Sequence, residues 1–228
     1  MEACFLLYFD CRMILLVHLL GVSLWEVAVM ANFWSLVEES AKFHGHICPG
    51  LLIGVRMGVA AMNFLGVDRA SDEELYAVVE NDSCAIDGLQ VVTGVTFGKG
   101  NLSFRDYGKM AATFYLRSRK TAIRLVFKPE SFEKVGNRDD LSEAMREENP
   151  EIKMAKFARI ANLFGDLLDD AVFEISIVDM DEPNMAEIRK SIKCEKCGEM
   201  TMETKTVVKN GKRLCIPCAT GKNYYQVK

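Results

Sequence analysis

The pattern of apolar and polar residues predicts both helices and strands before residue 183. Apolar positions at helical spacing predict helices over residues 32–42, 49–65, 84–92, 139–148 and 151–168. Short apolar runs predict strands over residues 75–80, 110–116, 122–127 and 171–178, the middle two paired through a basic turn. Because these elements mix without a regular strand–helix–strand alternation, the sequence predicts an α+β core.

The segment 49–65 is the most apolar of the predicted helices. Pro49 suits the first position of a helix, and Gly66 suits its end. Only Arg56 and Asn63 interrupt its apolar surface, so we expect a buried central helix.

The chain divides into three predicted parts: residues 1–31, an α+β core over 32–182, and a cysteine-rich unit over 183–228. The apolar run at 13–25 is shorter than the about 20 residues that span a membrane. It also lacks the basic n-region and cleavage site of a signal peptide. We interpret residues 1–31 as an upstream extension, with Met30 as the natural start. A helix that packs on the core or a partner, and a membrane anchor, are the alternatives.

Composition narrows the class of protein. The chain has 228 residues, of which 50% are hydrophobic and 26% charged, with a net charge of −4. This composition excludes collagen, a coiled coil and wholesale disorder. A net negative chain is also not, as a whole, a basic nucleic-acid binder. Because four of the eight cysteines form paired C-x-x-C spacings, we expect metal binding in a reducing, cytoplasmic setting.

The C-terminal cysteines have the spacing of a four-cysteine zinc ribbon. Cys194 and Cys197 form one C-x-x-C pair, and Cys215 and Cys218 form another after seventeen intervening residues. Four thiolates suit tetrahedral structural zinc, with a disulfide pair or redox dithiol as the alternatives. Asn210-Gly211 predicts a two-residue hairpin turn between the two pairs. Gly198 directly follows the first C-x-x-C pair, at a position where the turn around the metal often needs a positive φ.

Charge is unevenly distributed along the chain. From Arg189 onward there are ten Lys or Arg residues and three Glu residues, which leaves a formal −11 on the remainder. A basic ribbon is able to contact RNA, DNA or an acidic protein. We favour the simpler interpretation that the ribbon docks on its own acidic body or on that of a dimer mate. No membrane partner is favoured.

The segment His44-Gly45-His46-Ile47-Cys48-Pro49 is the strongest candidate for chemistry in the core. Pro49 favours an extended Cys48, and a fully extended segment would point His44, His46 and Cys48 to one side. Imidazole and thiolate together suit zinc, copper, iron or nickel. A helix start and a nearby imidazolium would lower the pKa of Cys48.

A second cysteine repeats this arrangement. Cys84 follows a predicted strand and begins a short helix, and Asp87 shares its helix face three residues later. We predict one pocket in which Cys48, Cys84 and Asp87 are the catalytic candidates and His44, His46, Cys48 and Cys84 form a second metal site. The alternative is that both cysteines are small buried hydrophobic residues.

Three segments, FHGHICPGLLIGVRMG, ENDSCAIDGLQVVTGVTFGKGNL and DYGKMAATF, resemble in this order the E-subunit family of formylmethanofuran dehydrogenase. The resemblance covers about residues 43–114, extends loosely to 178 and includes the ribbon. It implies an α+β core, an intertwined homodimer and a cysteine-lined groove. Val95 stands where many members carry cysteine. The further groove candidates that the resemblance implies are Gln90, Thr96, Lys99, Asn101, Tyr107 and Lys109.

Three functions are compatible with these features. The leading hypothesis is a metal-binding protein with a structural zinc and a groove that binds a second transition metal or a small ligand, with thiol or redox chemistry. The second is a regulatory or interaction module that senses a metal or metabolite. The third is an accessory component of a larger oxidoreductase. The chain has no ferredoxin-type cysteine run or pterin-enzyme signature, so whether it is itself an enzyme stays open.

Overall fold

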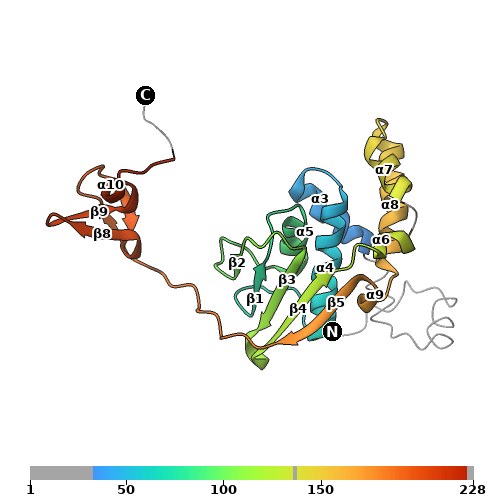
Figure 1. Cartoon of the computed structure of the whole chain (residues 1–228), viewed down its shortest axis with the longest axis horizontal. Coiled ribbons are helices and arrows are strands. Elements are labelled where there is room, and N and C mark those ends of the chain that lie inside the picture. The colour runs from blue at the N-terminus through green and yellow to red at the C-terminus, as the bar shows by residue number, and fades with distance from the viewer. Residues whose placement is uncertain (1–32, 136–137, 225–228) are drawn as a thin grey trace, which may run out of the picture. The chain divides into compact units, whose positions relative to one another are not determined.

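The computed structural model describes residues 33–135 and 138–224, which divide into two compact units between Met185 and Ala186 (Figure 1). The interpretations of residues 1–31, including the start at Met30, lie outside the described residues. No helix in the described ranges is long and apolar enough to cross a membrane.

The first unit is a mixed helix and sheet domain. Its helices are α3 (Phe33–His44), α4 (Pro49–Leu65), α5 (Ala85–Thr93), α6 (Ser131–Lys134), α7 (Arg138–Arg146), α8 (Pro150–Gly165) and α9 (Asp169–Val172). Its strands are β1 (Leu75–Val79), β2 (Leu102–Phe104), β3 (Ala111–Leu116), β4 (Thr121–Phe127) and β5 (Phe173–Val178). They form one sheet in the order β2-β1-β3-β4-β5, in which only β1 and β2 run parallel. Figure 1 shows α3, α4 and α5 beside this sheet.

Helix α4 is the buried centre of this unit, as its composition predicts. It begins at Pro49 and is capped by Gly66 in the left-handed conformation, at φ 59°. Apolar side chains of α4 pack with those of the sheet and of α8 in one core. Arg56 is its buried charge, and its guanidinium bonds to the Asp169 carboxylate and to the carbonyl oxygen of Leu167. This pair fastens the chain around α9 to the central helix.

The predicted sheet is confirmed in outline and extended at its edges. β3 and β4 form the expected antiparallel hairpin around residues 117–120. β2 has three residues and was not predicted, because so short a strand has no readable alternation. The strand predicted from residue 171 begins at Phe173, since α9 takes the preceding residues. Glu80, at the end of β1, pairs with Arg124 of β4 at 2.7 and 2.8 Å.

Pro150 begins a helix as well as following one. The helix expected over residues 139–148 is α7, which ends before Pro150, at Arg146. Pro150 then occupies the first turn of α8, where a missing N–H costs nothing. Asn149 caps that turn by accepting hydrogen bonds from the backbone N–H groups of Glu151 and Ile152 at 3.0 and 3.2 Å.

The second unit is built from two small hairpins and a short helix. β6 (Ser191–Lys193) pairs with β7 (Met200–Met202), and β8 (Thr206–Lys209) pairs with β9 (Lys212–Cys215), which leads into α10 (Ile216–Thr220). Asn210 and Gly211 have φ of 52° and 75°, so the predicted hairpin turn is confirmed. An α+β core with a four-cysteine unit confirms the predicted fold class.

Candidate metal centres

Backbone contact between α4 and α5 sets the position of the two core cysteines. Gly50, Gly54 and Gly58 lie one turn apart on α4 and face α5. A Cβ at Gly54 would lie 1.9 Å from the Ala85 carbonyl oxygen, so no side chain fits between the helices there. This close approach places the N-terminal ends of both helices together. The glycine spacing is a readable signal of this contact that the sequence predictions above did not use.

The two histidines reach the same place from the end of α3. The helix ends at His44 because Gly45 adopts φ 96° and donates its N–H to the Ala41 carbonyl at 2.7 Å. The expectation of a fully extended segment is therefore wrong for His44, which is helical. Cys48 is extended, at φ −149° and ψ 165°, as Pro49 requires.

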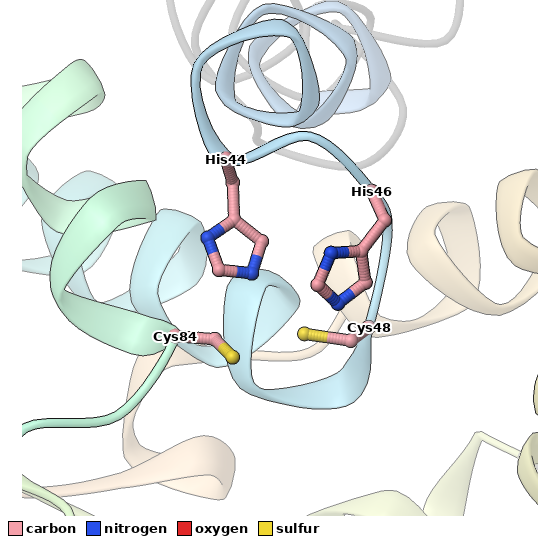
Figure 2. Close-up of side chains that lie close together, drawn as sticks. All are labelled: His44, His46, Cys48 and Cys84. Carbon is pink, nitrogen blue, oxygen red and sulfur yellow. The ribbon is translucent and has the colours of Figure 1, made fainter.

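His44, His46, Cys48 and Cys84 form one cluster. One ligand atom from each residue lies within 4.8 Å of those of the other three. Figure 2 shows both imidazole rings and both sulfurs directed toward a common centre. The ring centroids of His44 and His46 are 4.5 Å apart, with the planes tilted by 39°. Two imidazole nitrogens and two sulfurs are a tetrahedral zinc ligand set, so these residues fit a metal ion.

Asp87 fixes the orientation of one histidine. Its Oδ2 lies 2.7 Å from His44 Nδ1, and Gln90 Nε2 donates to its other oxygen at 3.4 Å. His44 Nε2 is buried and has no hydrogen-bond partner among the described residues. A carboxylate bound to one ring nitrogen, with the other left for a metal, is the usual arrangement of a ligating histidine.

The Cys48 thiol does not show the lowered pKa that the sequence predicted. Burial raises the pKa of Cys48, and a hydrogen bond with Cys84 raises it further. The backbone N–H of Leu51, 3.4 Å from Cys48 Sγ, acts in the opposite direction but does not prevail. The prediction of a lowered pKa was wrong because it considered the helix N-terminus and the nearby imidazolium and did not include the desolvation of the thiol by burial. A coordinating cation would reverse the balance and deprotonate the thiol.

The second cluster gathers the four C-terminal cysteines. The sulfurs of Cys194, Cys197, Cys215 and Cys218 lie within 4.8 Å of one another. Backbone N–H groups, first that of Cys197 and then that of Cys215, lower the pKa of Cys194 to about 6. A hydrogen bond with Cys215 and then burial raise the pKa of Cys218 to about 12. Gly198 adopts the expected positive φ, at 81°. The opposite pKa shifts arise because four thiols this close together hold protons between their sulfurs. A zinc ion would displace those protons, so the set fits structural zinc.

Comparison with known proteins identifies the first unit. The family model described as FmdE, molybdenum formylmethanofuran dehydrogenase operon, matches residues 43–168. The chain belongs to the FmdE family. A second model, the prokaryotic DksA/TraR C4-type zinc finger, matches residues 188–224 and contains the four-cysteine cluster. The FmdE match and the two Cys/His clusters together identify a metal-binding protein.

Two similar proteins extend this assignment. A probable S-adenosyl-L-methionine-binding protein of Archaeoglobus fulgidus is 34% identical over 213 residues, which cover 89% of this chain. The chain spans only 57% of that relative's length. The crystal structure of an FmdE-like protein of the tungsten formylmethanofuran dehydrogenase type, from Syntrophus aciditrophicus, matches with a TM-score of 0.55. It is 23% identical, over 85% of this chain and 95% of the other, and supports the fold alone.

The remaining residues predicted from the FmdE resemblance lie in two other places. Lys99 and Asn101 hold the loop before β1 in place. Lys99 Nζ lies 3.3 Å from each of three carbonyl oxygens at 70–72, and buried Asn101 donates to the carbonyl oxygens at 72 and 75. Thr96 stabilises its own turn, since its Oγ1 accepts from the backbone N–H of Lys99 and its N–H donates to Asn101 Oδ1. These contacts give all three residues a structural role.

Tyr107 and Lys109 lie on the exposed loop between β2 and β3. Their backbone N–H groups both donate to the Glu80 carbonyl oxygen, at 3.1 and 3.2 Å. Asn81 Nδ2 donates to the Lys109 carbonyl oxygen at 2.6 Å. The loop is therefore tied to the turn that leads to Cys84, while both side chains are exposed. Of the residues predicted beyond the histidines and cysteines, the structure brings Asp87 and Gln90 to the cluster.

Proposed function

We propose that this FmdE-family chain binds two metal ions, one in the core cluster and one in the zinc finger. The observation that supports the core site most strongly is the environment of the two ring nitrogens of His44. Its Nε2 atom is buried, has no hydrogen-bond partner in the described ranges, and faces two thiols, while its Nδ1 atom is bound by Asp87. Leaving a buried polar atom unsatisfied costs about 1–3 kcal/mol, and a coordinated cation removes that cost.

The donor atoms favour zinc in the core site. Magnesium and calcium prefer oxygen ligands, whereas sulfur with imidazole nitrogen suits zinc and its transition-metal neighbours. The finger differs because its four ligands are all cysteines, whereas the core set includes two histidines, of which His46 is exposed. We therefore assign the finger zinc a structural role and the core metal the functional role.

The relative from Archaeoglobus fulgidus favours a second candidate function. Its name describes probable S-adenosyl-L-methionine binding, and its alignment extends over 89% of this chain. We propose the core unit as the place where such a ligand would bind. Equilibrium dialysis of the full chain with S-adenosyl-L-methionine tests this candidate, and no saturable binding to metal-loaded protein would refute it.

Several expectations from the sequence stay predictions. These are thiol or redox chemistry in the groove, a homodimer, assembly with a larger oxidoreductase, a cytoplasmic location, and a contact of the basic ribbon with nucleic acid or with an acidic body.

Elemental analysis of the full chain tests the two-metal proposal. We expect two metal ions per chain in the wild type. The Cys48→Ser/Cys84→Ser double variant should retain only the finger metal, and the Cys194→Ser/Cys197→Ser double variant only the core metal. Circular dichroism of both variants verifies that the core remains folded. One metal per chain in the wild type, unchanged in the core double variant, would refute the core site.

A further inference from the structure

The two histidines of the core cluster differ in exposure. The His44 side chain is 12% exposed and lies at the end of α3, packed above α5. His46 is exposed, although it is only two residues away, because the left-handed Gly45 turns the chain out of the helix between them. The cluster therefore has a half-buried side, formed by His44 and the two cysteines, and an outward side, formed by His46.

The histidines also differ in what fixes their orientation. His44 Nδ1 is bound by Asp87 at 2.7 Å, and Gln90 bonds in turn to that carboxylate. The His46 ring contacts the His44 ring, but it has no hydrogen bond to any residue within 33–135 and 138–224. Outer partners of this kind orient a ligand and strengthen its bond to a metal. His46 lacks that support within the described chain.

We propose that His44, Cys48 and Cys84 are the permanent ligands of the core metal, and that His46 is an exchangeable ligand. On this proposal, which rests on the two-metal function above, the outward coordination position can be taken by the thiolate of a small external thiol. Two cysteines and one histidine with an exchangeable fourth position form a ligand set that catalytic zinc sites use.

The donor type favours a thiolate at the outward position, because sulfur matches the soft character of the two cysteine donors already present. Two cysteine thiolates balance the charge of a divalent ion. The N-terminal ends of α4 and α5 meet at the cluster, and the Asp87 carboxylate in the first turn of α5 offsets part of their positive charge. In the exchange, the metal–nitrogen bond to His46 breaks as the metal–sulfur bond forms. The thiol proton passes to the freed imidazole, and nothing is oxidised or reduced.

The test compares His46→Ala with His44→Ala, which lie on either side of Gly45, in Co²⁺-loaded full-length protein. A phosphine keeps the cysteines reduced, and 2-mercaptoethanol is the probe thiol. We expect His46→Ala to retain core Co²⁺ and His44→Ala to lose it. In His46→Ala, 2-mercaptoethanol should increase the sulfur-to-cobalt absorption until one thiol is bound per core site. If His46 occupies the position in about nine-tenths of wild-type molecules, the wild type should need about tenfold more thiol.

The zinc finger serves as an internal control because none of these substitutions touches its cysteines. His44→Gln repeats the test with a larger side chain in case His44→Ala does not fold. Loss of core Co²⁺ from His46→Ala, as from His44→Ala, would overturn the proposal by making both histidines permanent ligands. Retention without any thiol-dependent absorption would overturn it by excluding an external ligand. A wild type that binds no core metal would instead refute the core site itself, and this inference with it.

Discussion

The contact between α4 and α5 makes Gly54→Ala the most informative substitution in the core. The added Cβ would lie 1.9 Å from the Ala85 carbonyl oxygen, more than 1 Å inside the 3.0 Å below which such contacts are essentially never found. The added Cβ is fixed to the α4 backbone and the atom it meets belongs to the α5 backbone, so no side-chain rotation relieves the contact and the helices have to separate. Since Cys48 and Cys84 stand at the starts of these helices, separation also moves their sulfurs apart.

The expected loss of stability combines two opposing effects. Overpacking a well-packed core costs about 1–3 kcal/mol, and a clash between a Cβ and a backbone carbonyl belongs at the upper end. Alanine in place of glycine returns about 1 kcal/mol through its higher helix propensity. The free energy of unfolding should therefore fall by about 2 kcal/mol, which lowers Tm by roughly 4–8 °C for a unit of this size.

Urea and thermal unfolding of the full chain measure this loss. Fluorescence of Trp34, which packs against the core, reports on this unit, and a Trp25→Phe background leaves Trp34 as the one tryptophan of the chain. Gly98→Ala is the matched control, since nothing lies within 4 Å of its added Cβ, and it should change stability by less than about 0.5 kcal/mol. The added Cβ of Gly50→Ala would lie 3.1 Å from Cys84 Cβ. This variant should therefore bind the core metal more weakly than the wild type, with a smaller loss of stability than Gly54→Ala. Equal stability and metal content in Gly54→Ala and Gly98→Ala would refute the reasoning.

Three further substitutions test the cluster and the ion pairs. Asp87→Asn should weaken binding of the core metal by about 10–100-fold, measured by competition with a chromophoric chelator, because the imidazole loses its carboxylate partner; unchanged affinity would contradict that role. The Arg124 guanidinium holds the pKa of Glu80 below its usual value of about 4.3, so the stabilisation by the pair is present above that pH and is lost as pH falls through the lowered value. Glu80→Gln should therefore lower the free energy of unfolding most at neutral pH, and its difference from the wild type should become smaller in acid. The same difference in urea titrations at every pH from 7 to 3 would contradict this. Asp169→Asn removes the anionic partner of the buried guanidinium on α4 and should lower the free energy of unfolding by about 3 kcal/mol, while its exposed neighbour Asp170→Asn should have little effect.

The sequence predicted the fold best where a residue's own chemistry determines the backbone. Pro49 and Gly66 fixed both ends of α4, and Asn210-Gly211 fixed the β8–β9 hairpin. It failed for β2 and α9, which have three and four residues, because such elements form only against neighbours. β2 pairs with β1, a contact that local periodicity does not encode.

The candidate site was predicted by residue type, whereas its internal geometry was not. Histidine and cysteine near two helix starts were enough to nominate the cluster. The sequence did not show that Asp87 binds His44, since 43 residues separate them and the contact depends on how α3 meets α5. Nor did it show that Lys99 and Asn101 are bonded to backbone carbonyls, which depends on how one loop covers another.

The same geometry predicts that the two units respond differently to metal removal. Close backbone packing of Gly54 and Gly88 holds the core cluster in place, and the hydrophobic core around it is large. In the finger, Cys194, Leu214, Cys215 and Ala219 form the described hydrophobic cluster, which is too small to offset the entropy of ordering the chain. Binding at such a site supplies the folding free energy itself.

A chelator should therefore empty the core site without unfolding the core, and should unfold the finger. Amide hydrogen exchange measures both responses on one sample. We expect protection of α4 and β3 to persist and protection of β8 and β9 to be lost, because only the finger depends on its ion for a stable structure. Persistent protection of β8 and β9 in chelator would contradict this dependence, and loss of protection throughout α4 would show that the core cluster is held together by metal and not by helix packing.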